Sequence, residues 1–202
     1  MLLINNLHLI RSNKIIFNNI NIAASSGKII LIKGRNGSGK TTLIKTILNI
    51  IEPTNGEIFW LGKRTKTNIF KFYKDTTYII DKSTSVNNLT VLENIYFWKN
   101  FSSSAVSHDS IYKLLEILEL KEYLNKQVMY LSLGEIKKLE LIRLIIEEKK
   151  LWIMDEPYNN LDTNSIEIFN QTFSDHLNKG GIILFSSHFQ PNIIGLEVIL
   201  VN

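Results

Sequence analysis

An eight-residue stretch in the first quarter of the chain decides the fold, and it reads Gly34-Arg35-Asn36-Gly37-Ser38-Gly39-Lys40-Thr41. It fits the pattern G-x-x-x-x-G-K-[ST], follows the apolar run 29–32 directly and is followed at once by helical periodicity. Glycines let the backbone curl so that successive N–H groups point at phosphate oxygens, and the start of the helix adds a partial positive charge. We therefore expect a strand, a phosphate-binding loop and a helix in this order.

The residue types in this loop indicate how a nucleotide would be held. Lys40 would neutralise the β and γ phosphates of ATP, and the Thr41 hydroxyl would be a ligand of Mg²⁺. The candidate nucleotide-binding residues are those of the stretch and the one after it: Gly34, Arg35, Asn36, Gly37, Ser38, Gly39, Lys40, Thr41 and Thr42.

Two hydrophobic periods alternate along the chain. The runs 29–32, 151–154 and 182–185 are apolar at consecutive positions, as in strands of a parallel sheet that is covered on both faces. Apolar residues at helical spacing lie between these runs, at 111, 114, 115 and 118 and again at 136, 139, 142 and 146. The pattern predicts a doubly wound α/β core.

The first part of the chain has a different pattern. Residues about 2–25 and 56–80 resemble short strands separated by turns, which suggests an antiparallel sheet beside the phosphate-binding unit. A mostly helical insert is expected at roughly 86–130. We expect one domain over 1–202, with a helical subdomain at about 86–135.

Polar residues stand at the ends of two of the predicted core strands. The run 151–154 ends in Asp155 and Glu156, and the run 182–185 is followed by His188. Ligands of parallel sheets collect at the carboxyl ends of the strands. Asp155 would be the partner of Mg²⁺, Glu156 would polarise the attacking water as general base, and His188 would donate to the γ-phosphate. The alternative interpretation is that the strand simply ends in a polar turn. The phosphate loop upstream makes this alternative the weaker of the two.

Composition restricts the class of protein. The 202 residues are 45% hydrophobic and 21% charged, which is ordinary for a globular domain and argues against disorder. The formal net charge of +4 favours anionic partners without selecting one. The absence of cysteine excludes disulfides, zinc–thiolate sites and thiol catalysis. No stretch approaches the roughly 18–20 apolar residues of a transmembrane helix, and the N-terminus lacks signal-peptide features, so any membrane role would depend on a partner.

A further motif lies between the phosphate loop and the acidic strand end. Residues 130–135 read Tyr-Leu-Ser-Leu-Gly-Glu and resemble the signature L-S-G-G-Q of the ABC ATPase family, and residues 160–162 stand where that family has its D-loop. The chain resembles this family over essentially its whole length. The resemblance implies a P-loop NTPase (RecA-like) parallel-sheet core with an antiparallel β subdomain and a helical insert that carries the signature. It also implies a head-to-tail dimer, in which Ser132 and Gly134 of one copy address the ATP of the other.

One branch of the family is the most similar. The run 151–157, the ending 180–191 and the short length look like the haem-exporter ATPases of cytochrome c maturation. This resemblance implies transmembrane permease partners like CcmB and CcmC. We expect no nucleic-acid partner, because the chain lacks interleaved basic and aromatic residues. It places the chain on the cytoplasmic face of a bacterial inner membrane or on the matrix face of the mitochondrial inner membrane.

The sequence departs from the family pattern at several positions. Arg11 stands where many members have an aromatic residue that stacks on adenine, and Arg stacks more weakly. Lys82 replaces the usual Q-loop glutamine; a lysine cannot bind Mg²⁺, although Asp81 beside it could. The signature has Leu133 and Glu135 for Gly and Gln, and Glu135 adds negative charge near the triphosphate. We predict slow turnover.

Three functional classes follow from these features. The first is a working ATPase motor, for haem or for another small solute. The second is a nucleotide-dependent clamp with little hydrolysis, which the residues at 82 and 135 favour. The third is a nucleic-acid or ribosome-acting ABC protein; it is disfavoured because the chain has neither a second cassette, nor long coiled coils, nor interleaved basic and aromatic residues.

Overall fold

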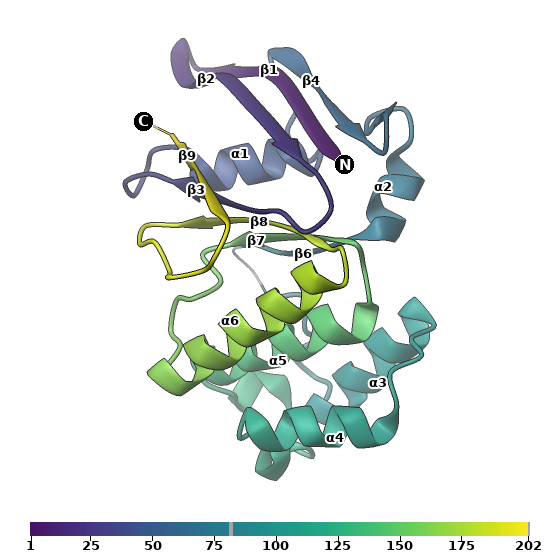
Figure 1. The fold of residues 1–202 in the computed structure, drawn as a ribbon. Coiled ribbons are helices and arrows are strands. Elements are labelled where there is room, and N and C mark those ends of the chain that lie inside the picture. The colour runs from purple at the N-terminus through teal and green to yellow at the C-terminus, as the bar shows by residue number, and fades with distance from the viewer. Residues whose placement is uncertain (81–82, 202) are drawn as a thin grey trace. The chain divides into compact units, whose positions relative to one another are not determined.

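The structure is a computed structural model that describes residues 1–80 and 83–201 (Figure 1). The chain divides into two compact units, each with its own contacts. The first contains 1–80, Lys150–Pro157 and 173–201; the second contains 83–149 and Tyr158–Thr172. Asp81 and Lys82, where we predicted a changed Q-loop, lie outside the described residues.

A five-stranded parallel sheet is the core of the first unit. Its strand order is β6-β7-β8-β3-β9, and each of these strands is parallel to its neighbours. The strands are β3 Ile29–Lys33, β6 Thr76–Ile79, β7 Leu151–Asp155, β8 Ile182–Ser187 and β9 Leu196–Leu200. All residues of β7 and β8 are buried, the apolar runs 151–154 and 182–185 together with the polar residues that end each strand. The predicted parallel core is confirmed.

An antiparallel sheet lies over the helix that follows the phosphate loop. Its strand order is β2-β1-β4-β5, and the strands are β1 Leu2–Arg11, β2 Lys14–Ala24, β4 Asn55–Trp60 and β5 Lys63–Arg64. The two sheets enclose α1 (Lys40–Ile47), as Figure 1 shows. One apolar cluster joins these layers, from Leu2 and Ile4 through Leu43 to Ile30. The predicted antiparallel subdomain is confirmed.

The stretch 56–80 differs from the prediction of short antiparallel strands in its second half. Residues Ile69–Asp75 form α2, and β6 joins the parallel sheet beside β7. Ile69, Phe72 and Tyr73 stand at helical spacing and pack against the apolar core. The aromatic residues of this stretch have a high propensity for strands. The stretch is nevertheless helical, because a helix buries Phe72 on its core-facing side.

The second unit is helical. Its elements are α3 Val91–Ser102, α4 His108–Ile117, the short 3-10 turns Lys121–Tyr123 and Val128–Tyr130, α5 Leu133–Glu147 and the first part of α6 Thr163–Asn178. Thr90, Ser107 and Ser132 cap α3, α4 and α5 through their hydroxyl groups. Within the described part of the chain, no helix is both long and apolar enough to span a bilayer.

One titratable group in the first unit, His176, is partly buried, and this burial favours its neutral form. The ring of His176, near the end of α6, stacks on Trp152 of β7 with 3.7 Å between the ring centroids. Burial lowers the pKa of His176 from its ordinary value of 6.5 to about 4. The folded state therefore binds a proton more weakly than the unfolded state does.

We expect this histidine to make the protein less stable in acid. As the pH falls from 6.5 toward 4, the unfolded chain is protonated first, and the free energy of unfolding should decrease by up to about 3 kcal/mol. The variant His176→Phe keeps a ring over Trp152 and should lose this part of the pH dependence. Urea denaturation at a series of pH values measures the effect, and an identical pH dependence in the variant would rule out His176 as its source.

Candidate functional site

The phosphate loop depends on glycine at two positions. A Cβ on Gly34 would collide with the Val201 carbonyl oxygen and with the side chain of Ser38. Gly39 has φ +97°, and a Cβ there would lie 2.8 Å from Ile16 Cγ2. Both positions therefore exclude a side chain, and the backbone passes close to its neighbours as the sequence motif predicts.

The start of α1 is suited to an anion. Gly39 is its N-cap and has no side chain to accept from the amides of the first turn, which contains no acidic residue. These amides can therefore donate hydrogen bonds to a negatively charged group, and the positive end of the helix dipole attracts it. Among the described residues, Ser38 Oγ is buried without a hydrogen-bond partner, so its hydroxyl is also available to a phosphate oxygen.

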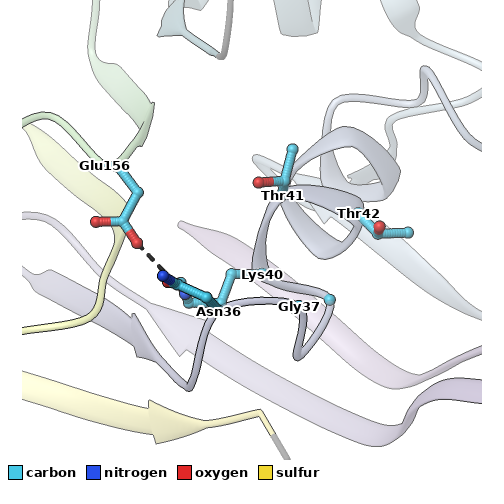
Figure 2. Close-up of a pocket in the computed structure, with 7 residues that line it drawn as sticks. Asn36, Gly37, Lys40, Thr41, Thr42 and Glu156 are labelled. Atoms are coloured by element: carbon cyan, nitrogen blue, oxygen red, sulfur yellow. Dashed lines mark ion pairs between the residues drawn. The ribbon is translucent and has the colours of Figure 1, made fainter. Parts of the chain in front are cut away.

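A cavity of about 340 Å³ opens above this helix start. It is lined by Asn36, Gly37, Gly39, Lys40, Thr41, Thr42 and Glu156 (Figure 2). Six of these seven residues belong to the predicted phosphate loop or follow it directly, and the seventh is the predicted general base. Arg35 and Arg11 are exposed and do not line the cavity.

Lys40 connects the loop to the end of β7. Its side chain is almost fully buried, and Nζ donates to the carbonyl oxygens of Gly34 at 3.0 Å and Arg35 at 3.2 Å. Nζ also lies 3.3 Å from Oε1 of Glu156, the ion pair drawn as a dashed line in Figure 2. A buried ammonium needs such partners, and a triphosphate would offer it stronger ones.

Asp155 and Thr41 form an oxygen-rich pair beside the cavity. Thr41 Oγ1 donates to Asp155 Oδ2 at 2.5 Å, and Ser186 Oγ donates to Asp155 Oδ1. A hydroxyl and a carboxylate are ligands that suit Mg²⁺. No group of three or more His, Cys, Asp or Glu side chains in residues 1–80 and 83–201 could hold a metal alone. The hydroxyl of Thr41 and the carboxylate of Asp155 fit an Mg²⁺ ion that would take its other ligands from phosphate and water.

Glu156 and His188 lie together at the mouth of the site. Oε2 of Glu156 is 3.1 Å from His188 Nδ1, and the His188 side chain is more than half exposed. Glu156 itself adopts a left-handed backbone conformation with φ +46°. One carboxylate thus lies within reach of the buried Lys40 and of an exposed imidazole, a position from which it could accept a proton from water.

The signature residues Ser132, Gly134 and Glu135 belong to the second unit. Ser132 and Glu135 form a reciprocal capping box at the start of α5: Ser132 N donates to Glu135 Oε2 at 2.6 Å, and Glu135 N donates to Ser132 Oγ at 3.2 Å. Burial would raise the pKa of Glu135, but hydrogen bonds from Ser132 and Tyr123 outweigh it and hold the pKa below its usual value. A Cβ on Gly134 would lie 2.8 Å from the Asn160 carbonyl oxygen, so this position is also restricted to glycine.

One residue of the site was missed from the sequence. Ser186 stands opposite Asp155 in the pairing of β7 with β8 and contacts both acidic residues. Its signal in the sequence is weak, because it is the first of two serines that follow the apolar run 182–185.

Comparison with known proteins identifies the family of the chain. The family model described as ABC transporter matches residues 17–159. The chain belongs to the ABC transporter family. It is an ATP-binding, ATP-hydrolysing subunit of this family, as the signature and the phosphate loop predicted.

Two similar proteins from different organisms carry the same name. The chain is 36% identical to the cytochrome c biogenesis ATP-binding export protein CcmA of Reclinomonas americana, with 100% of this chain and 90% of that protein covered. It is 32% identical to the CcmA of Dechloromonas aromatica, with 96% and 95% covered.

Solved structures of ABC proteins show the same fold. A putative ABC transporter ATP-binding protein from Pyrococcus furiosus matches with a TM-score of 0.84 at 23% identity, covering 99% of this chain and 96% of that one. The cassette MJ0796, solved as a dimer bound to ADP and Pi, matches with a TM-score of 0.77 at 22% identity, covering 94% and 88%.

The geometry of Lys40 leads to a prediction about nucleotide affinity. Lys40→Ala should weaken ATP binding about tenfold or more, because the charged partner of the phosphates is lost. Lys45→Ala, one turn later in α1, is the matched control and should bind ATP as the parent does. Fluorescence titration with a labelled ATP measures both. Equal affinities of the two variants would show that Lys40 is not a phosphate ligand.

Proposed function

We propose that this ABC subunit is the ATPase of a haem exporter that acts in cytochrome c biogenesis. The observation that carries the proposal is the 36% identity to a CcmA protein over the whole chain. The similarity to a second CcmA from a different organism at 32% identity supports it.

The side chains of the first unit have distinct roles in this proposal. Lys40 and the amides at the start of α1 bind the β and γ phosphates of ATP, aided by the loop residues on either side. Thr41 and Asp155 hold Mg²⁺, which neutralises phosphate charge when bound. Glu156 accepts the proton of the attacking water, and His188 donates a hydrogen bond to the γ-phosphate.

Two copies of the chain complete the site in this proposal. Ser132 and the Gly134 backbone begin α5, whose positive end would face the γ-phosphate held by the opposite copy. The dimeric neighbour bound to ADP and Pi supports such an assembly by analogy of fold. Hydrolysis in each site would then separate the two copies.

The membrane role depends on partners. We propose that the dimer docks on transmembrane permease subunits like CcmB and CcmC. The chain would then act as a peripheral protein on the cytoplasmic face of a bacterial inner membrane or on the mitochondrial matrix face. Export of another small solute by a different permease would use the same ATPase unit.

A nucleotide-dependent clamp is the second candidate, and Glu135 favours it. In the structure its carboxylate accepts from Ser132 N and so occupies the anion-binding end of α5. A phosphate that approaches this end would meet a negative charge already in place. This arrangement favours slow hydrolysis.

Replacing that carboxylate should therefore speed the reaction. Glu135→Gln can close the same capping box, because a glutamine side chain also accepts from the N-cap amide, and it removes the charge. We expect turnover to rise about threefold to tenfold, which corresponds to roughly 1 kcal/mol of relieved repulsion. Phosphate release by the full chain measures the rate. If the variant is no faster than the parent, Glu135 does not limit turnover.

Variants of Lys40 and Glu156 separate the motor from the clamp. Each is expressed in place of the parent chain, and holocytochrome c is measured by haem staining. If the chain is a motor, both Lys40→Ala and Glu156→Gln should abolish maturation, and Glu156→Gln should accumulate as an ATP-bound dimer in solution. If it is a clamp, only Lys40→Ala should fail.

The same experiment tests the haem branch. Normal levels of holocytochrome c in both variants would contradict a role in cytochrome c biogenesis. Parent-like ATP hydrolysis by Glu156→Gln would contradict the role given to Glu156.

A further inference from the structure

We propose that Ser186 is a positioning residue for hydrolysis, which fixes the two acidic residues of the site through a single buried hydroxyl. The inference rests on the roles proposed above for Asp155 and Glu156.

Ser186 is placed to contact both residues at once. It is the second-last residue of β8, has no exposed surface, and pairs in register with Asp155 of β7. Its Oγ donates to Asp155 Oδ1, and the same Oγ accepts from Glu156 N at 3.0 Å. Its carbonyl oxygen also lies 3.1 Å from Glu156 N. The one hydroxyl is thus used both as donor and as acceptor.

The contact with Asp155 fixes the orientation of that carboxylate. Ser186 occupies Oδ1 while Thr41 Oγ1 occupies Oδ2 at 2.5 Å. A rotation of the carboxylate would break both hydrogen bonds. Without the Ser186 hydroxyl, Thr41 would be the one remaining side-chain partner of the Asp155 carboxylate among residues 1–80 and 83–201. The position of Asp155 relative to the phosphate loop would then be less well defined.

The contact with Glu156 holds a strained backbone. Glu156 has φ +46°, a conformation that residues other than glycine rarely adopt. The bonds from its N–H to Ser186 hold this conformation, and the side chain that follows lies 3.3 Å from Lys40 and 3.1 Å from His188. Strain at a functional residue persists only where neighbours determine it, and Ser186 is such a neighbour.

A matched control lies next in the chain. Ser187 is also fully buried in β8, but its Oγ accepts from Phe189 N at 3.2 Å. Removal of either hydroxyl takes away one buried hydrogen-bonding group from the same strand. A difference between the two variants in catalysis therefore reports on the contacts with Asp155 and Glu156.

The experiment compares Ser186→Ala, Ser186→Thr and Ser187→Ala in the full chain. For Ser186→Ala we expect kcat for ATP hydrolysis to fall about tenfold to a hundredfold, because a hydrogen bond to a charged group is lost, with KM changed much less. Ser186→Thr keeps the hydroxyl and should recover most of kcat. Ser187→Ala should hydrolyse ATP at nearly the parent rate. Ser186→Cys, close in size but a weak hydrogen-bonding group, replaces the alanine variant if that one does not fold.

A binding measurement complements the kinetics. Mn²⁺ affinity in the presence of ADP, measured by electron paramagnetic resonance, should weaken in Ser186→Ala and not in Ser187→Ala. If the two alanine variants lose kcat equally, or if threonine does not restore it, or if Mn²⁺ affinity is unchanged, the inference is wrong. If Glu156→Gln is inactive and Ser186→Ala is as active as the parent, only the role of Ser186 is contradicted. If Glu156→Gln hydrolyses ATP at the parent rate, the proposed role of Glu156 is contradicted as well.

Discussion

The site depends on the ion pair between Lys40 and Glu156. It joins the phosphate loop to the end of β7, and the Lys40 side chain is almost completely removed from solvent. The two carbonyl oxygens of Gly34 and Arg35 share this ammonium, so the loop is curled around the group that is expected to meet phosphate. A buried ammonium is stable only with partners of this kind, and a triphosphate can replace them with stronger ones.

The parallel sheet explains why the remaining groups collect here. β7 and β8 run side by side in register, so Asp155, Glu156 and His188 emerge at the same edge as the loop that follows β3. The hydrogen bond from Thr41 to Asp155 is a second link between loop and sheet. The groups that we propose for ATP binding and hydrolysis are therefore brought together by the strand order. The capping box of Ser132 begins a separate helix in the second unit.

The sequence predicted those features that depend on local pattern. The glycine spacing of the loop, the apolar strands and the acidic strand end are each visible within a few residues, and the structure has the strands where the pattern placed them. Features that depend on distant partners were not visible. The helical conformation of α2 depends on the packing of Phe72 against the core. The contacts of Ser186 are made with the neighbouring strand β7. Glu140, inside the apolar pattern of α5, is buried because residues 83–85 donate hydrogen bonds to its carboxylate.

A crystal structure of the full chain with Mg²⁺ and a non-hydrolysable ATP analogue tests the central claim most directly. The account predicts that Lys40 Nζ leaves the carbonyl oxygens of Gly34 and Arg35 for the β and γ phosphates. It also predicts that the metal lies between Thr41 and Asp155. A triphosphate bound elsewhere, with Lys40 still held by those two carbonyls, would contradict it.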